Sequence, residues 1–192
     1  MFAPLDKNQV PYGVLYDRAA QGAGLIQFNA QAPDTSSVLH FRQAVYDLHT
    51  TAFNTALLPC QANVRDYARQ SSDRDTALIG MLQYKFGYID STAVASNLLY
   101  YDTNTPALLH DVPGRPRSPY LTQEVTVMAA LLDTARYGVL RFRLDTRLCY
   151  ANTGRTLSSV SVDFADGNGP QTLLPNQTRT VTYGSTGRKV LS

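Results

Sequence analysis

The stretch that most constrains the fold spans residues 157–169, with the sequence Leu-Ser-Ser-Val-Ser-Val-Asp-Phe-Ala-Asp-Gly-Asn-Gly. Val160, Val162 and Phe164 alternate with polar residues, which places them on one face of a half-buried strand. Asp-Gly and Asn-Gly pairs follow at residues 166–169, and these residue types tolerate the positive φ angles of tight turns. The stretch therefore predicts a β-strand that ends in a turn.

The residues around this stretch continue an all-β pattern. One strand is predicted over residues 124–132 and a longer one over 137–150. In the longer strand the apolar side chains are expected to share the core face: Leu140, Phe142, Leu144, Leu148 and Tyr150. The opposite face is expected to carry Arg141, Arg143, Asp145 and Arg147. Short strands over 173–174, 178–183 and 188–192 follow at the spacing typical of β-sandwiches.

The pattern before residue 118 is mixed. Ser36 or Ser37 can cap a helix that ends near residue 56, because apolar side chains at 38, 41, 45, 48 and 52 recur at helical spacing. A short helix is predicted near 14–20, a helical turn near 64–68, and a strand over 77–88. Residues 93–101 fit a short helix or a strand.

Three prolines between residues 110 and 120 exclude regular structure there and indicate a domain boundary. We therefore expect an α+β chain of two parts. A helix-containing region occupies residues 1–118, and an Ig-like antiparallel β-sandwich occupies 119–192. The last predicted strand has barely begun at Ser192, so this sandwich is expected to be incomplete, as in a fragment of a longer protein.

Two motifs carry a family resemblance. Val-Asp-Phe-Ala-Asp-Gly at 162–167 and Val-Thr-Tyr-Gly-Ser-Thr-Gly-Arg-Lys-Val at 181–190 resemble the PKD (polycystic kidney disease) repeat. The matching residues are Asp163, Phe164, Asp166, Gly167, Tyr183 and Gly187. Ala165 stands where the family usually has Gly, and no Trp precedes Asp163. The resemblance covers about residues 137–192 and implies a divergent PKD-like module.

A second resemblance concerns the N-terminal part. Residues 1–17, together with Asp-Val-Pro-Gly-Arg at 111–115 and Ser-Pro-Tyr at 118–120, are similar to the beginning of large secreted multidomain proteins of Bacteroidetes-type bacteria. This similarity implies an extracellular or cell-surface location, with further domains of the same polypeptide downstream as partners.

The two resemblances together imply a non-catalytic structural or adhesive module that contacts polysaccharide or a cell-surface protein. Two alternatives stay open. The chain would be the accessory N-terminal portion of a secreted hydrolase whose catalytic domain lies downstream, or a glycan-binding module that works alone.

Composition and motifs argue against several other classes. The chain has 17 basic and 15 acidic residues, and the basic residues are scattered, so we expect no nucleic-acid partner. No apolar run reaches about 18 residues, so no membrane insertion is expected. The N-terminus lacks a secretory signal, so either the chain is cytosolic or its signal has been removed, and we expect the second. No serine lies in a Gly-x-Ser-x-Gly elbow and no phosphate loop is present, so we expect no enzyme and no organic cofactor.

A calcium site is the one metal site that the sequence suggests. Asp163, Asp166 and Asn168 offer oxygen ligands within six residues, as calcium loops do. In the alternative, Asp166 caps the turn through its own backbone and Asp163 bonds a neighbouring strand.

Tyrosine is abundant, with 12 residues, and flat aromatic rings stack on the apolar faces of sugars. Tyr100 and Tyr120 are therefore candidates for a glycan platform. The alternative is that both rings belong to the core or to an interface, with the hydroxyl at its edge.

The two cysteines, Cys60 and Cys149, are too far apart in sequence for a metal or redox motif. A disulfide between them would close a loop of about 90 residues and stabilise the fold by roughly 4 kcal/mol through the unfolded state. It would also favour an exported protein. The alternative is two unrelated thiols.

Overall fold

The computed structural model describes residues 2–16, 36–54, 58, 76–132 and 138–192. It is rich in strands and contains one α-helix within the described residues, which agrees with the expected α+β class. The helical elements are a 3-10 turn η1 (Lys7–Gln9) and helix α2 (Val38–Thr51). The strands are β1 (Leu15–Tyr16), β2 (Thr76–Ile89), β3 (Leu99–Tyr101), β4 (Leu109–Asp111), β5 (Tyr120–Ala130), β6 (Val139–Ala151), β7 (Val160–Asp163), β8 (Pro170–Leu173) and β9 (Thr178–Thr182).

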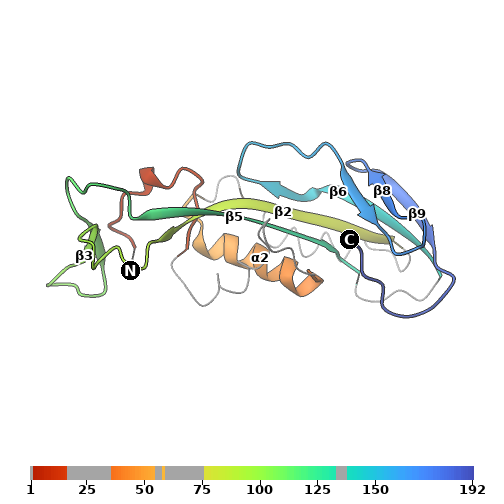
Figure 1. Cartoon of the computed structure of the whole chain (residues 1–192), viewed down its shortest axis with the longest axis horizontal. Helices are drawn as coiled ribbons and strands as arrows, with labels where there is room; N and C mark the ends of the chain where they lie inside the picture. Colours follow the sequence, from red (N-terminus) through yellow and green to blue (C-terminus); the bar gives the residue numbers. More distant parts are fainter. Residues whose placement is uncertain (1, 17–35, 55–57, 59–75, 133–137) are drawn as a thin grey trace.

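Strand β2 is the axis of the fold. Strand β5 pairs with it antiparallel along one edge, from Ile79 opposite Ala130 to Ile89 opposite Tyr120. Along the other edge of β2, two strands pair with it in parallel: β6 with its first part and the short β1 with its end. Strand β9 pairs with the far edge of β6 and continues the sheet. The result is an elongated molecule, with the β3–β4 hairpin at one end and β8 and β9 at the other (Figure 1).

This topology corrects two sequence predictions. The boundary predicted between residues 118 and 119 divides the main sheet, because β2 precedes it while β5 and β6 follow it. Residues 15–16, predicted to be helical, instead form β1, whose Leu15 and Tyr16 pair with Gly87 and Tyr88 of β2. Residues 17–20 and the helical turn predicted at 64–68 lie outside the described residues.

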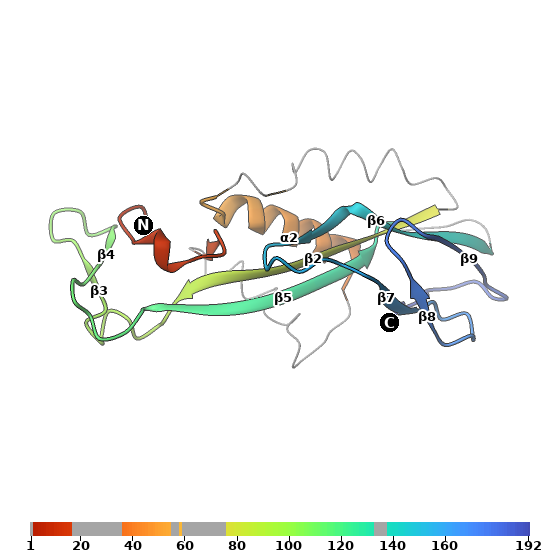
Figure 2. The same ribbon diagram turned by 90° about the horizontal axis from the view of Figure 1, so that it is seen from above.

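The sequence prediction for α2 is confirmed, although the helix ends earlier than expected. Ser37 is the N-cap, and its hydroxyl accepts a hydrogen bond from the backbone N–H of His40. The helix lies along one face of β2 and β5 (Figure 2). The buried residues at this contact form the helix-side core: Val14, Tyr16, Phe41, Ala44, Val45, Leu48, Leu78, Leu82, Tyr84, Phe86, Val125, Val127, Ala129 and Leu148.

Two further cores lie along the sheet. The tip core holds together the residues that flank η1, strand β1, the β3–β4 hairpin and the start of β5. It consists of Leu5, Val10, Leu15, Ala93, Leu98, Leu99, Leu109 and Tyr120. The C-terminal core lies between the main sheet and the two-stranded sheet of β7 and β8. It consists of Ala77, Ile79, Phe142, Leu144, Val162, Phe164, Leu173 and Val181.

A bulge in β6 separates the helix-side core from the C-terminal core. Leu144 pairs with Ile79 and Cys149 pairs with Met81, so four residues of β6 lie opposite Gly80 alone. The step from 144 to 149 is odd, and the strand therefore exchanges its two faces. Phe142 and Leu144 lie in the C-terminal core, whereas Leu148 lies in the helix-side core.

The single core face predicted for residues 140–150 is therefore wrong beyond Leu144. Asp145, predicted to face solvent, is fully buried in the bulge, where it accepts a hydrogen bond from the backbone N–H of Arg147 at 3.0 Å. Asn176, from the turn between β8 and β9, holds the same bulge. Its backbone N–H donates to the Leu144 carbonyl at 2.6 Å, and its side-chain oxygen accepts from the backbone N–H of Thr146 at 3.2 Å.

Candidate functional site

The β3–β4 hairpin is the most exposed aromatic feature of the described residues. Tyr100 and Tyr101 are 45% and 47% exposed, and Tyr100 lies directly opposite His110 in the hairpin register. The rings of Tyr100 and His110 stack with centroids 5.4 Å apart and planes inclined by 26°. One face of this hairpin thus carries a flat aromatic pair, while Leu99 and Leu109 on the other face are buried in the tip core.

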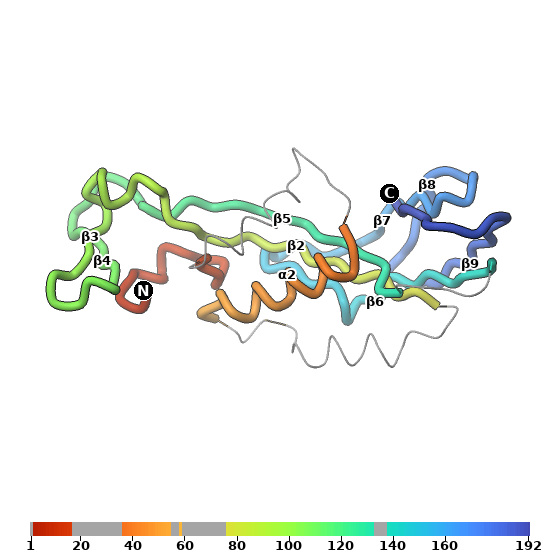
Figure 3. Tube along the Cα trace, turned by 90° about the horizontal axis from the view of Figure 1, so that it is seen from below, coloured from red at the N-terminus to blue at the C-terminus, as the bar shows by residue number. Residues whose placement is uncertain are grey.

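The hairpin is fixed by a network around the carboxylate of Asp111. Arg115 forms an ion pair with this carboxylate, the backbone N–H of Asp6 donates to it at 2.6 Å, and the Tyr120 hydroxyl donates to it at 3.0 Å. Arg115 also donates to the side chain of Gln9. The network joins the N-terminal segment, β4 and β5, and Figure 3 shows the N-terminal segment alongside the hairpin. The hairpin is therefore tied to its neighbours by charge-assisted hydrogen bonds as well as by its core.

The turn that precedes β3 is fixed in a similar way. Asp90 accepts hydrogen bonds from the backbone N–H of Thr92 at 2.9 Å and from its hydroxyl at 2.8 Å, and it pairs with Arg117 at 2.8 Å. The bonds from Thr92, reinforced by Arg117, lower the pKa of the Asp90 carboxyl to about 2. This carboxylate therefore stays charged, and the turn stays closed, well into the acid range.

The two tyrosines predicted as a glycan platform have different environments. Tyr120 is 8% exposed, its ring lies in the tip core, and the Arg115 guanidinium lies 5.6 Å from its ring centroid. Burial, together with the bond to Asp111, raises the pKa of the Tyr120 hydroxyl. Tyr120 is thus a packing residue and offers no ring face to a sugar. Tyr100 is exposed, and its role in glycan binding stays a prediction.

The predicted calcium residues lie in the loop between β7 and β8. Asp163 accepts from the backbone N–H of Ala165 at 2.8 Å, and Asp166 accepts from the backbone and side-chain amides of Asn168 at 3.1 and 2.9 Å. The bonds from Asn168 lower the pKa of the Asp166 carboxyl. The Asp166 contacts are the turn cap described above as the alternative, whereas the Asp163 side chain bonds the backbone two residues on and not a neighbouring strand. Within the described residues no group of three acidic, histidine or cysteine side chains converges, and calcium binding stays a prediction.

Cys149 is a half-buried free thiol in the structure, and its sulfur donates to the carbonyl of Asp145 at 3.3 Å. Burial raises the pKa of the thiol to about 11. Cys60 lies outside the described residues, so the Cys60–Cys149 bridge stays a prediction.

Sequence reasoning missed a buried polar group on α2. Asp47 is fully buried, and its carboxylate accepts from the Tyr16 hydroxyl at 3.0 Å and from the Gln43 side-chain amide at 2.7 Å. Tyr84 of β2 is also fully buried, and no described residue lies in hydrogen-bond geometry with its hydroxyl, which has Tyr16 as its polar neighbour. The helical spacing did not point to this burial, because Asp47 lies about 100° around the helix from Leu48 and outside the apolar stripe of residues 38, 41, 45, 48 and 52.

Comparisons with known proteins leave the family open. No protein-family model, no curated protein and no solved structure matches the chain. Among the described residues, no helix is long and apolar enough to cross a bilayer.

Proposed function

We propose that this chain is a non-catalytic structural and adhesive module of an exported cell-surface or secreted protein. The observation that carries the proposal is the exposed ring of Tyr100, which stacks on the half-buried His110, because this pair lies on a hairpin held by the Asp111 network at one end of an elongated sheet. An aromatic ring presented on a rigid element loses little entropy when it contacts a partner. We take the tip to be the adhesive end, with insoluble polysaccharide as its partner.

The PKD-like sandwich is part of this proposal, and contacts among the motif residues support it. Phe164 is fully buried in the C-terminal core, where its ring lies 4.9 Å from that of Phe142. The Tyr183 hydroxyl donates to the Phe164 carbonyl at 2.8 Å, and Asp163 caps the turn that follows β7. Two parts of the motif that are about twenty residues apart in sequence thus meet in space.

The two sheets that enclose the C-terminal core are also consistent with a small sandwich. Residues 188–192, predicted as its last strand, are not a strand in the structure. Ser192 nevertheless exchanges two backbone hydrogen bonds with Asp163 of β7, at 2.6 and 3.1 Å.

The experiment is retention of the purified chain on a panel of insoluble polysaccharides: cellulose, chitin, xylan and peptidoglycan. Tyr100→Ala removes the exposed ring of the stacked pair, and we expect the binding constant measured from the retained fraction to fall at least about fivefold, because stacking of a flat group on an aromatic ring contributes about 1–3 kcal/mol. Tyr46→Ala is the matched control, since Tyr46 is similarly exposed, at 41%, but lies on α2 away from the hairpin. Its retention should equal that of the wild type.

Two outcomes would contradict the proposal. Wild-type chain that is retained on none of the polysaccharides removes the adhesive function, and equal retention of Tyr100→Ala and wild type removes the tip as the contact. Circular dichroism and the urea midpoint of each variant show that the fold is kept, which is expected because the Tyr100 side chain lies outside the tip core.

A further inference from the structure

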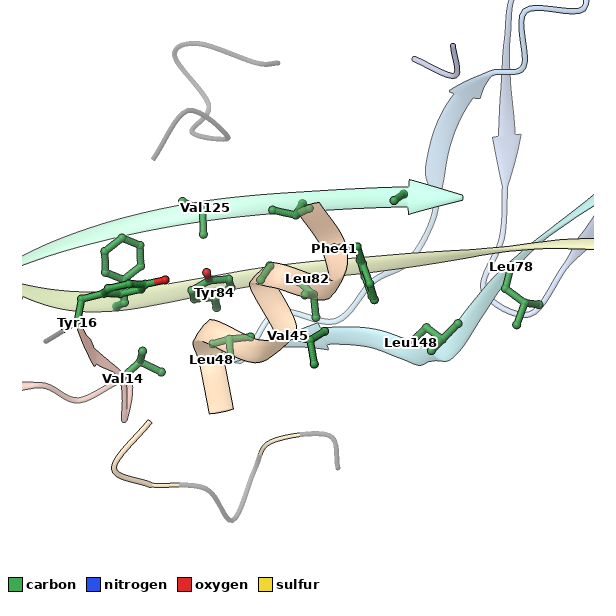
Figure 4. Close-up of a cluster of buried hydrophobic side chains, with 14 residues drawn as sticks. Val14, Tyr16, Phe41, Val45, Leu48, Leu78, Leu82, Tyr84, Val125 and Leu148 are labelled. Carbon is green, nitrogen blue, oxygen red and sulfur yellow. The ribbon is translucent and has the colours of Figure 1, made fainter. Parts of the chain in front are cut away.

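The buried carboxylate of Asp47 lies where helix α2 meets the sheet. The helix directs Phe41, Val45 and Leu48 into the helix-side core, and Asp47 lies along one side of this apolar stripe. Figure 4 shows Tyr16 and Tyr84 side by side next to the helix, with the Tyr16 hydroxyl directed toward Tyr84. Asp47 therefore contacts both layers, since its partner Gln43 belongs to the helix and its partner Tyr16 belongs to β1 of the sheet.

The surroundings of Asp47 contain no countercharge within the described residues. The groups that face it are the Tyr16 phenol from β1, the Tyr84 phenol from β2, and the Gln43 amide from its own helix. The Thr51 hydroxyl donates to the Asp47 backbone carbonyl, at 2.6 Å, and not to its carboxylate. The residues that β5 and β6 contribute to the same core are Val125, Val127, Ala129 and Leu148, with Tyr150 packed at its margin.

A carboxylate in such a place favours its neutral form. Burial removes water from the charged group, and two neutral donors compensate only part of that loss. The pKa of Asp47 is accordingly raised by burial, against the opposing effect of the bonds from Gln43 and Tyr16. Burial, followed by the negative charge on Asp47, also raises the pKa of Tyr84, and burial raises the pKa of Tyr16. Both phenols therefore stay neutral.

We propose that α2 is fastened to the sheet by a pH-dependent latch, in which Asp47 docks as a neutral carboxylic acid and weakens the helix–sheet contact when it loses its proton to solvent. The anion would be left against Tyr16 and Tyr84 without a cation. Because the helix-side core is covered by α2, loosening of the helix would uncover the apolar face of β2 and β5.

The sign of the effect follows from linkage. The folded chain binds the Asp47 proton more tightly than the unfolded chain, in which an aspartate titrates near about 3.9. The stabilisation from the neutral acid is therefore complete below about pH 3.9 and is lost as the pH rises through the raised pKa of the folded state. A carboxylate held by hydrogen bonds, such as Asp102 with Thr105 and Asn104, has a lowered pKa and the opposite sign.

The test compares wild type with Asp47→Asn by urea unfolding from pH 4 to pH 8. Asparagine has the shape of the neutral acid and does not titrate. We expect the midpoints of the two chains to lie close together at pH 4 and the variant to be the more stable at pH 8, with the gap opening as the pH rises. Asp102→Asn is the control of opposite sign: when its series is extended down to about pH 2, wild type should gain stability over this variant as the pH rises to about 4, with little further change up to pH 8.

A second measurement does not depend on the variant folding. The carboxyl carbon shift of Asp47 in the wild-type chain, followed by NMR against pH, should report a pKa above about 3.9, and amide exchange of residues 41–51 should accelerate through the same pH interval beyond its intrinsic dependence. A carboxyl pKa at or below about 3.9, or a gap between wild type and Asp47→Asn that does not change with pH, would overturn the latch.

Discussion

Gly80 of β2 lies against the ring of Phe41 of α2. A Cβ atom on Gly80 would stand 2.6 Å from Cζ of Phe41 and 3.3 Å from Cβ of Leu148. The helix can approach the sheet only because this position has no side chain, and the same position lies opposite the bulge in β6. One glycine thus permits both the seating of the helix and the change of faces in β6.

Replacement of Gly80 by alanine should therefore destabilise the fold. The added methyl group must displace either the Phe41 ring or the β6 bulge, and overpacking of this kind costs about 1–3 kcal/mol. Urea unfolding monitored by tyrosine fluorescence measures the loss. Gly184→Ala is the matched control, because a Cβ there meets no atom within 4 Å, and it should leave the midpoint unchanged within about 0.5 kcal/mol. Equal midpoints for Gly80→Ala and wild type would show that Phe41 and Leu148 can move away from the added methyl group without a loss of stability.

Asn152 completes the sheet between the end of β6 and the start of β1. Its side-chain oxygen accepts from the backbone N–H of Lys85 at 2.7 Å, and its amide nitrogen donates to the carbonyls of Lys85 and Tyr12 at 2.8 and 3.0 Å. The side-chain amide thus takes the place of a peptide group beside β2, where neither β6 nor β1 pairs with Lys85.

Asn152→Asp keeps the shape of this side chain and removes both donors. A carboxylate would face two carbonyl oxygens, and the loss of hydrogen bonds at a part-buried site should cost about 1–3 kcal/mol. Hydrogen exchange of the Lys85 and Gly87 amides should accelerate in the variant, whereas that of the Tyr84 amide, on the β5 edge of the ladder, should change less. If all three amides keep their wild-type protection, Asn152 does not hold this part of the sheet together.

Much of the local structure could be predicted because it is decided by short segments. The Ser37 cap, the helical spacing of Phe41, Val45 and Leu48, and the alternation in β2 each depend on neighbours a few residues away. The cap of Asp166 on the turn after β7 was predicted for the same reason, since this side chain bonds the backbone two residues on. The bond from the Ala165 N–H to Asp163 was not predicted.

The faces of β6 could not be predicted in this way. Residues 140–150 alternate except at Thr146, and this one polar residue does not reveal that the strand changes faces at Asp145, where Gly80 and Asn176, distant in sequence, fix a bulge. The buried position of Tyr120 has a similar origin, since its partner Asp111 is held by Asp6 and Arg115. Register and burial of this kind depend on contacts between distant segments, which a pattern along one strand does not contain.

Ala165 is held in a left-handed conformation, with a φ of 55°. This is the position where the PKD repeat usually has glycine, so the departure in the sequence coincides with a conformation that alanine adopts at a cost of about 1–2 kcal/mol. Ala165→Gly should relieve this strain. Because glycine loses about 0.5–1 kcal/mol more backbone entropy on folding, we expect a net stabilisation of roughly 0.5–1 kcal/mol.

Thermal and urea midpoints of Ala165→Gly measure that gain. The control is Ala107→Gly in the turn between β3 and β4, where the residue is exposed and does not have a positive φ. This variant should lose a little stability through entropy alone. A lower stability of Ala165→Gly would mean that the methyl group of Ala165 stabilises the turn by more than the backbone strain at this residue destabilises it.

The thiol of Cys149 should react slowly in the folded chain. Alkylation proceeds through the thiolate, and burial raises the pKa of this thiol to about 11. In a Cys60→Ser variant only Cys149 can react, and its alkylation by iodoacetamide should rise about tenfold per pH unit from pH 8 to pH 10. In urea the alkylation rate of the same thiol should be half-maximal at about pH 8.5 and level off above about pH 9.5. The same half-maximal pH in the folded chain would show that Cys149 is solvated.

The same chemistry decides between a bridge and two separate thiols in the wild-type chain. Protein recovered from an oxidising compartment is denatured without reductant, alkylated and weighed. Two added alkyl groups mean that both thiols were free, as Cys149 is in the structure. No addition in the monomer means that Cys60 and Cys149 are joined, and the bridge would then anchor Cys60 on the face of β6 that packs at the C-terminal core. In that case reduction should lower the urea midpoint by the equivalent of roughly 4 kcal/mol, the loop-closure value for about 90 residues.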